Sequence, residues 1–362
     1  MKVLMLAKID SSHTKKWALA LKDKGIEIAL FSIHCPNKND DWYKQLDYVY
    51  FPTKDIASSG LFAKINYVTL FLSLNKLIRD FKPDILHSHF ATHYSFLGNI
   101  SGFKKHIITV WGSDVYVFPK KRKLNKLIFE FNLKKALCII STSNAMAKEV
   151  ALYTNKSVTI IPFGIDMDLF KPQSNQNRIN DIIIGNIKSL EPIYGIDILI
   201  KAFESVKRRF PEKNIKLVIV GRGSKLKEYQ TLVSNLHLSE HVFFKGSVLP
   251  EDVPSILKTF NIFACLSRNE SFGVSVIEAM ACKIPVVVSK TPGFLEVVDS
   301  ETNGLFVEID NIDDAANKIS SLILDEEQMM TIKNNAFQRV NELYNLKDNI
   351  NKQIELYHTI LK

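Results

Sequence analysis

The sequence predicts an α/β protein of two domains, each built on a parallel sheet covered by helices. Three observations support this prediction. The chain of 362 residues is longer than one hydrophobic core usually serves. Short apolar runs alternate with helix-period patterns in both halves, which is typical of repeated βα units and parallel strands. A polar, turn-rich stretch at 161–181 separates the halves and marks the domain boundary.

The first half begins directly with a strand, because MKVLMLAKID has too few apolar residues between its charges for a signal peptide. Its longest predicted helix ends at Phe81, since Lys82 and Pro83 follow. The expected elements are strands at Val3–Ala7, Ile26–Ile33, Asp84–His87, His106–Val110, Ala136–Ser141 and Ser157–Ile161, and helices at His13–Lys24, Gly60–Phe81, His93–Ile100, Leu124–Lys135 and Ser143–Leu152.

The alternation restarts after the boundary and ends in a helical tail. The expected elements are strands at Ile182–Ile187, Lys216–Val220, Val242–Lys245, Ile262–Leu266 and Ile284–Val288, and helices at Ile196–Arg209, Ser224–Leu236, Glu251–Lys258, about Gly273–Cys282, Ile312–Leu324, Glu326–Leu343 and Asn345–Leu361. Together they predict two Rossmann-like domains, at 1–170 and 176–344. We expect the active site in the cleft between the carboxyl ends of their strands.

Composition and charge narrow the function classes. Four scattered cysteines with no CxxC pair argue against a zinc site or a disulfide framework, and they indicate a reducing compartment. No apolar stretch approaches the roughly 18 residues that span a bilayer, so we expect a cytosolic protein. Residues 1–175 hold 25 Lys and Arg against 14 Asp and Glu, which predicts an anionic partner. Since no nucleic-acid motif is present, anionic lipid or a lipid-phosphate substrate suits this excess better.

The stretch from Asn269 to Ser289, NESFGVSVIEAMACKIPVVVS, carries the strongest functional pattern. A loop carboxylate, Glu270, precedes a small Phe272-Gly273 opening, and a second carboxylate, Glu278, follows about one turn into a predicted helix. Free N–H groups at a helix start bind phosphate, and carboxylates accept hydrogen bonds from sugar hydroxyls. The spacing therefore suits a ligand with both groups. An ordinary strand–loop–helix segment with two solvated acids remains the alternative on spacing alone.

Several segments together resemble a known family. Glu270 to Glu278 match the E-x7-E pattern of retaining GT-B glycosyltransferases, and EAMACKIPVVVSKTPGFLEVV looks like glycosyltransferase family 4. The segments IPFGIDMDLFKP, WGSD and SETNGLFVEID agree with it. The resemblance implies two facing domains, the first for the acceptor and the second for a nucleotide sugar, with the last helix, about 345–362, crossing back to the first domain. It also implies sugar transfer with retention at the anomeric carbon, most often from a UDP-sugar.

The resemblance also implies roles for particular residues. Glu270 would meet the donor sugar, Glu278 the ribose, and the backbone of 272–274 (Phe272, Gly273 and Val274) the diphosphate, while base contacts come from loops around Lys245 and Gly246. No metal or other cofactor is expected, because N–H groups and a basic side chain can neutralise the departing diphosphate.

The sequence departs from the family at the cationic part of the donor site. Relatives open the second domain with an Arg and then a Lys-Gly that grip the diphosphate. Here Lys188 falls near the Arg position and Tyr194 occupies the Lys position. Arg222, within Gly221-Arg222-Gly223, is a candidate to supply the lost charge, although such a turn after a strand is more often only a turn. Each charge-assisted contact contributes roughly 1.5–3 kcal/mol.

The first domain departs from the family as well. Trp111 stands where many relatives have a His, whereas Asp114 of the Gly-Ser-Asp loop remains. We predict Asp114 as a catalytic residue and His89, at a strand end, as a catalytic residue that contacts the acceptor; a structural role is the alternative for His89. The loop KIDSSHT at 8–14 lacks the usual Gly-Gly pair, and its Ser and His side chains either contact ligand or cap the next helix.

Two segments of the first domain are candidates for a membrane surface. One is the apolar stretch Gly60–Phe81, for which a core-facing helix is the alternative. The other is PKKRKLNK at 119–126, where Lys120, Lys121, Arg122 and Lys123 would attract anionic head groups by roughly 1 kcal/mol each. The overall prediction is a glycosyltransferase acting on a cell-surface glycan or lipid-linked acceptor. The rival functions are a nucleotide-sugar epimerase and a non-catalytic nucleotide-sugar-binding protein.

Overall fold

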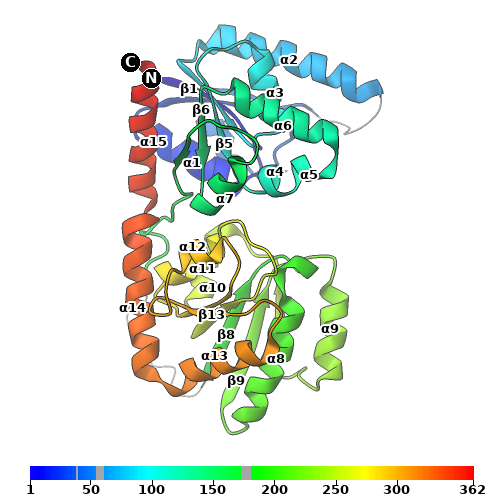
Figure 1. The fold of residues 1–362 in the computed structure, drawn as a ribbon, viewed down its shortest axis with the longest axis vertical. Helices are drawn as coiled ribbons and strands as arrows, with labels where there is room; N and C mark the ends of the chain where they lie inside the picture. The colour runs from blue at the N-terminus through cyan, green and yellow to red at the C-terminus, as the bar shows by residue number, and fades with distance from the viewer. Residues whose placement is uncertain (38–39, 54–60, 173–180) are drawn as a thin grey trace. The chain divides into compact units, whose positions relative to one another are not determined.

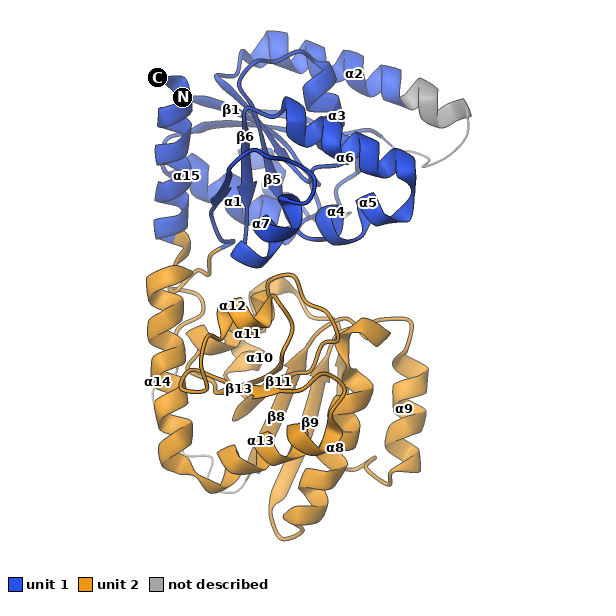
Figure 2. Ribbon diagram, viewed as in Figure 1, with its two compact units in different colours: residues 1–163, 347–362 blue, residues 164–346 orange. Residues whose placement is uncertain are grey.

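Each half of the chain folds around its own parallel sheet in the computed structural model (Figure 1). The structure describes residues 1–37, 40–53, 61–172 and 181–362, with no side chains described for 61–66. Unit 1 comprises 1–163 and 347–362, and unit 2 comprises 164–346 (Figure 2). The division falls between Phe163 and Gly164, a little before the expected position at 170. Residues 173–180 of the predicted domain boundary, and Gly60 at the predicted start of the long helix, lie outside the described residues.

Unit 1 contains a seven-stranded sheet in the order β3-β2-β1-β4-β5-β6-β7, with every neighbouring pair parallel. The strands are β1 (Lys2–Leu6), β2 (Glu27–Phe31), β3 (Tyr48–Tyr50), β4 (Ile85–His89), β5 (His106–Val110), β6 (Cys138–Ser141) and β7 (Val158–Ile160). The strand order reverses between β1 and β4. Ligands of open α/β sheets bind beyond the carboxyl ends of the strands at such a switch point.

The helices of unit 1 cover both faces of this sheet. They are α1 (Ser12–Asp23), α2 (Leu61–Phe81), α3 (His93–Ile100), α4 (Ser113–Tyr116), α5 (Phe118–Lys121), α6 (Lys123–Lys135), α7 (Asn144–Val150) and α15 (Leu346–Leu361), with a 3-10 turn η1 (Trp42–Gln45). Side chains alternate along β4. Leu86 packs with the core under α2, whereas His87 hydrogen-bonds Tyr357 of α15 on the opposite face, Nδ1 to Oη 2.6 Å. The last helix therefore belongs to unit 1.

Helix α2 is mainly a core helix. Leu70, Leu74, Leu77 and Phe81 recur at helical spacing and are buried against β1, β2 and β4. The helix stops before Pro83, because the residue that precedes a proline is disfavoured in helical conformation. The face of α2 that carries these four residues therefore packs on the core, which was the alternative to membrane contact in the sequence analysis. Val68 and Leu72 lie on the outer face of the helix and are exposed.

Unit 2 contains a six-stranded parallel sheet in the order β10-β9-β8-β11-β12-β13. Its elements are β8 (Asp181–Ile187), η2 (Pro192–Tyr194), α8 (Ile196–Arg209), β9 (Asn214–Val220), α9 (Leu226–Asn235), β10 (Val242–Gly246), η3 (Pro250–Asp252), α10 (Val253–Leu257), β11 (Ile262–Cys265), α11 (Val274–Ala281), β12 (Val286–Ser289), α12 (Phe294–Val297), β13 (Leu305–Val307), α13 (Ile312–Leu324) and α14 (Glu326–Leu343). Here the order reverses between β8 and β11. The fold class predicted from the sequence is confirmed in both units.

Helix α8 shows how the second core is built. Its apolar residues recur at spacings of three and four, and Leu199, Phe203 and Val206 are fully buried against the sheet. Gly195 precedes the helix with φ 62°, and a Cβ at this position would lie 1.9 Å from the carbonyl oxygen of Leu266. Only glycine permits this approach, which places the start of α8 directly against the end of β11.

Candidate functional site

Two predicted site residues meet at the switch point of unit 2. Lys188 directly follows β8, and Glu270 lies in the loop after β11, the strand that pairs with β8. The Lys188 ammonium and the Glu270 carboxylate form an ion pair, with side chains only 14% and 11% exposed. Because the two strands are neighbours only in the folded sheet, tertiary structure brings this pair together.

The environment of Lys188 keeps it charged. Burial alone would lower its pKa, but the negative charge and hydrogen bond of Glu270 outweigh burial, so the pKa is raised above its ordinary value. The ring of Tyr194 also contacts the ammonium, which lies 5.0 Å from the ring centroid, and such a contact favours the charged form. The positive charge of Lys188 is thus already paired with the Glu270 carboxylate.

The Gly221-Arg222-Gly223 turn packs on the segment that follows β8. A Cβ at Gly221 would lie 1.9 Å from the carbonyl oxygen of Lys188, so this glycine is required by close backbone contact. Gly221 also donates its N–H to the carbonyl of Gly246, 2.8 Å. The Arg222 side chain is exposed near Gly246 and has no carboxylate partner among the described residues. The turn therefore has a structural role and presents an unpaired guanidinium beside the Lys188 segment.

The start of α11 lies next to Glu270. Gly273 adopts φ 95°, and a Cβ there would lie 2.7 Å from the Phe294 ring and 3.8 Å from Cγ of Glu270. The N–H groups of Gly273 and Val274 have no acceptor among the described residues. The Phe272 ring is buried and packs against Tyr344, so its side chain is not available to a ligand. This arrangement suits a phosphate, as free N–H groups at a helix start do.

Glu278 lies on the second turn of α11 and is half-buried. It stands four residues before Cys282, whose thiol pKa is raised to about 12 by burial and by the nearby Glu278 charge. Its predicted contact with ribose remains a prediction.

Arg268 was missed in the sequence analysis. Its guanidinium binds both carboxylate oxygens of Asp197, at 2.7 and 3.0 Å, and its Nε contacts Asp310 at 2.7 Å. Arg268 thereby ties the Glu270 loop to the first turn of α8. The available signal was an arginine just after a predicted strand together with an acid at a predicted helix start, a pattern too common to single out.

In unit 1 the corresponding switch point gathers aromatic rings. His89, at the end of β4, lies 5.0 Å from Trp111 between ring centroids, and His13 stacks on Phe163 at 4.2 Å. His89 is 3% exposed, and neither ring nitrogen has a partner in the described part of the chain. Burial lowers its pKa to about 3, so the ring is neutral. Ser11 is the N-cap residue of α1 but makes no side-chain cap, which leaves the KIDSSHT alternatives open.

A small cavity adjoins His89 on the α15 side of the sheet. It has a volume of about 10 Å³, close to the space that one water molecule occupies. Thr142 and Gln353 line it, and each has a buried polar atom without a partner among the described residues. An acceptor contact by His89, as predicted, would require a group small enough for this space or a movement of Trp111.

Asp114 binds backbone rather than facing solvent. Its carboxylate accepts hydrogen bonds from the N–H groups of Ala91, Trp111 and Gly112, at 2.8, 3.1 and 2.8 Å. Burial raises the pKa of this carboxyl more than these bonds lower it. Asp114 therefore joins the loops after β4 and β5, and its predicted catalytic role would have to act through the shape of those loops.

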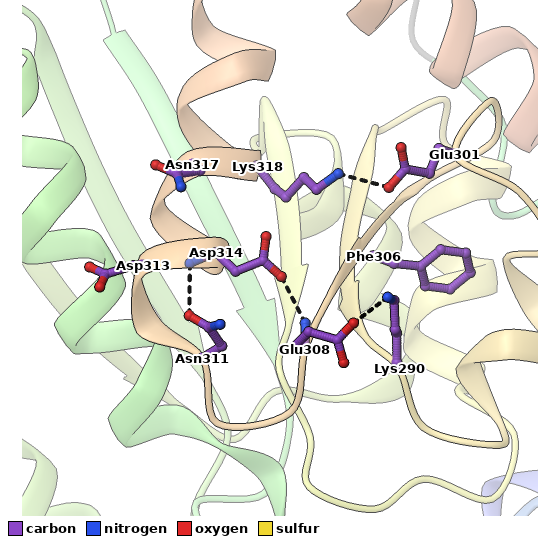
Figure 3. Close-up of a pocket in the computed structure, with 9 residues that line it drawn as sticks. All are labelled: Lys290, Glu301, Phe306, Glu308, Asn311, Asp313, Asp314, Asn317 and Lys318. Atoms are coloured by element: carbon purple, nitrogen blue, oxygen red, sulfur yellow. Dashed lines mark hydrogen bonds and ion pairs between the residues drawn. The ribbon is translucent and has the colours of Figure 1, made fainter.

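A surface depression of unit 2, about 500 Å³, lies elsewhere, beside β13 and α13 (Figure 3). Lys290 pairs with Glu308, and Lys318 pairs with Glu301 at 2.7 Å, so the charged groups largely satisfy one another. None of the predicted site residues lines it. Within the part of the chain that the structure describes, no His, Cys, Asp and Glu side chains cluster as metal ligands would.

The basic segment of unit 1 forms α5 and the start of α6. Lys120 pairs with Glu149 at 2.7 Å, whereas Lys121, Arg122 and Lys123 are exposed. Leu124 and Leu127 follow on the same helix and are 64% and 62% exposed. The segment thus exposes basic and apolar side chains close together in the chain.

Two Rossmann-like units with parallel sheets are the architecture of GT-B glycosyltransferases, which use nucleotide-sugar donors. The comparisons agree. The family model "Glycosyl transferase 4-like" matches residues 2–143, and "Glycosyl transferases group 1" matches 169–339. The chain belongs to this family of glycosyltransferases.

Relatives and solved structures cover nearly the whole chain. N-acetyl-alpha-D-glucosaminyl L-malate synthase of Bacillus anthracis is 24% identical over 94% of this chain and 91% of its own length. An Escherichia coli enzyme, UDP-Gal:alpha-D-GlcNAc-diphosphoundecaprenol alpha-1,3-galactosyltransferase, is 25% identical over 79% and 78%. Anabaena HepE, solved in complex with UDP, shares the fold with a TM-score of 0.81, 20% identity and coverage of 99% and 100%.

Proposed function

We propose that this enzyme transfers a sugar with retention from a UDP-sugar to a lipid-linked or cell-surface glycan. The observation that carries the proposal is the grouping of Lys188, Glu270 and the unpaired N–H groups of Gly273 and Val274 at one switch point. Few ligands need an acid for hydroxyls and a helix start for phosphates together, and a nucleotide-diphosphate sugar is one of them.

The residues of unit 2 suggest how the leaving group is stabilised. As the bond to the sugar breaks, negative charge develops on the diphosphate, and the N–H groups at the start of α11 can receive it without reorganisation. Lys188 is neutralised by Glu270, so Arg222 is the better candidate for an added positive charge. Glu278 would bind the ribose and Glu270 the sugar hydroxyls. The departing phosphate would itself take the acceptor proton, which requires no histidine at position 111.

The choice of UDP and of the acceptor rests on similarity and charge. The printed name of the E. coli relative includes a UDP-sugar donor and a diphosphoundecaprenol-linked acceptor, and HepE was solved with UDP. The exposed Lys121, Arg122 and Lys123 beside two exposed leucines suit an anionic lipid surface. No helix among the described residues is long and apolar enough to cross a membrane. We propose peripheral docking of unit 1 on the cytoplasmic leaflet.

The decisive experiment incubates the purified protein with a panel of UDP- and GDP-sugars and lipid-linked acceptors. Nucleotide diphosphate released together with a glycosylated product, whose new linkage keeps the donor's anomeric configuration by NMR, supports the proposal. An epimerised donor would support an epimerase instead. Nucleotide-sugar binding without turnover would indicate a non-catalytic binding protein, and an inverted linkage would overturn the retaining mechanism.

A further inference from the structure

Tyr194 lies in the turn η2 beside Lys188, and no role is assigned to it above. Its ring centroid is 5.0 Å from the Lys188 ammonium, which also pairs with Glu270. The phenol hydroxyl has no hydrogen-bond partner among the described residues. The ring, rather than the hydroxyl, is therefore the part of Tyr194 that the structure uses.

The ring is held in a fixed position relative to the Glu270 loop. Tyr194 ends the 3-10 turn η2, and the following Gly195 packs against the carbonyl of Leu266. Arg268 donates its N–H to the carbonyl of Ile193, 2.7 Å, and its guanidinium bonds the carbonyl of Pro192. Two residues of one loop, Leu266 and Arg268, thus hold the turn that carries the ring.

An aromatic ring at position 194 can hold the Lys188 ammonium in place, whereas a second cation there could not. The face of an aromatic ring attracts an ammonium without competing for its carboxylate partner. A second ammonium about 5 Å away would repel Lys188 and draw Glu270 toward itself. The ring therefore lets one lysine and one glutamate remain a defined pair.

We propose that Tyr194 is a positioning residue whose ring holds Lys188 against Glu270, so that the Glu270 carboxylate is oriented for the donor sugar. The inference rests on the proposed donor site. It predicts an effect on the sugar-dependent step and not on binding of the nucleotide diphosphate, because UDP lacks the group that Glu270 would contact.

The test compares Tyr194→Phe, Tyr194→Leu and Tyr194→Lys with the wild-type enzyme. UDP affinity is measured by calorimetry, and kcat is measured by UDP release from the donor that the wild-type enzyme uses. Tyr194→Phe keeps the ring and should stay within about twofold of wild type in both. Tyr194→Leu and Tyr194→Lys should lose about tenfold in kcat, while the Kd for UDP changes less than about twofold.

Phe337→Leu is the matched control, because Lys283 lies 5.1 Å from the Phe337 ring in the same unit. It deletes an equivalent cation–aromatic contact and should leave kcat and UDP affinity unchanged. The inference is overturned if Tyr194→Leu matches wild type, if Tyr194→Phe is as impaired as Tyr194→Leu, or if UDP affinity and melting temperature fall together. If the wild-type enzyme itself releases no UDP from any donor, the proposed function fails instead.

Discussion

Lys188 and Glu270 are 82 residues apart in the chain, yet their charged groups form a nearly buried ion pair where β8 and β11 end side by side. Removing one partner of such a pair is costlier than removing both, because the remaining charge is left buried and uncompensated. This ion pair therefore links the stability of unit 2 to the proposed donor site. Its contribution to stability and its contribution to turnover can be measured separately.

Glu270→Gln should impair both stability and turnover. The substitution leaves the Lys188 ammonium without its counter-charge, so the free energy of unfolding should fall by about 3 kcal/mol. The kcat should fall at least about a hundredfold. Urea denaturation and UDP release measure the two effects. The double variant Lys188→Met with Glu270→Gln should recover most of the stability but none of the turnover; an equally unstable double variant would contradict the ion-pair explanation.

Arg222→Gln should weaken UDP binding by about tenfold or more, since a charge-assisted contact to phosphate contributes roughly 1.5–3 kcal/mol. The melting temperature should stay the same, because Arg222 is exposed and has no carboxylate partner among the described residues. Calorimetry at two salt concentrations measures the binding. Arg208→Gln, on the exposed side of α8, is the control. Equal UDP affinity of both variants would remove Arg222 from the donor site.

Gly273→Ala should displace the start of α11. The new Cβ would meet the Phe294 ring at 2.7 Å while the backbone stays in a left-handed conformation, so we expect a loss of about 2 kcal/mol or more and weaker UDP binding. Gly25→Ala is a matched control, with φ 79° but open space around the position, and should lose only about 1 kcal/mol. Thermal and chemical denaturation measure the loss of stability in each variant. Equal losses in the two variants would show that the Phe294 ring does not crowd a Cβ at position 273.

Acid should destabilise unit 1 through its buried histidines. The pKa values of His13, His89 and His106 are lowered to about 3 by burial, whereas an unfolded histidine titrates near 6.5. The unfolded chain therefore binds more protons below pH 6.5. Stability from these groups is complete above that pH and is lost as the pH falls toward 3, by about 1.4 kcal/mol per pH unit for each histidine.

Urea denaturation between pH 7 and pH 5 measures this dependence. His89→Phe should reduce the slope by about one proton, because this ring has no partner to lose. A His89→Phe slope equal to that of the wild type would mean that His89 is not the neutral, buried group described.

Replacing Lys121, Arg122 and Lys123 with Gln should reduce binding to anionic vesicles by about tenfold or more, because each basic residue contributes roughly 1 kcal/mol near such a surface. Lys120 is retained, since it pairs with Glu149. A matched variant changes Lys201, Arg208 and Lys227, which are exposed on unit 2, to Gln. Cosedimentation with phosphatidylserine vesicles should distinguish the two, and identical behaviour would refute the docking surface.

Local patterns predicted most of the architecture. Strands such as Ile262–Cys265 and amphipathic helices such as α8 carry their periodicity within a few residues, so they could be predicted without knowing their neighbours. Short elements escaped: α4, α12 and β13 span only three or four residues, too few for a period to show. The glycosyltransferase assignment likewise came from segments whose residues are contiguous in the chain.

The sequence by itself determined two βα domains and the position of Glu270 before a helix that can bind phosphate. Only the tertiary structure decided how the side chains pair. It pairs Lys188 with Glu270 and brings the Tyr194 ring to the same ammonium. It also pairs Arg268 with Asp197, packs His89 against Trp111, and surrounds the Asp114 carboxylate with backbone N–H groups. The physical reason is that strand order, and not chain order, determines which loops meet at the end of a parallel sheet.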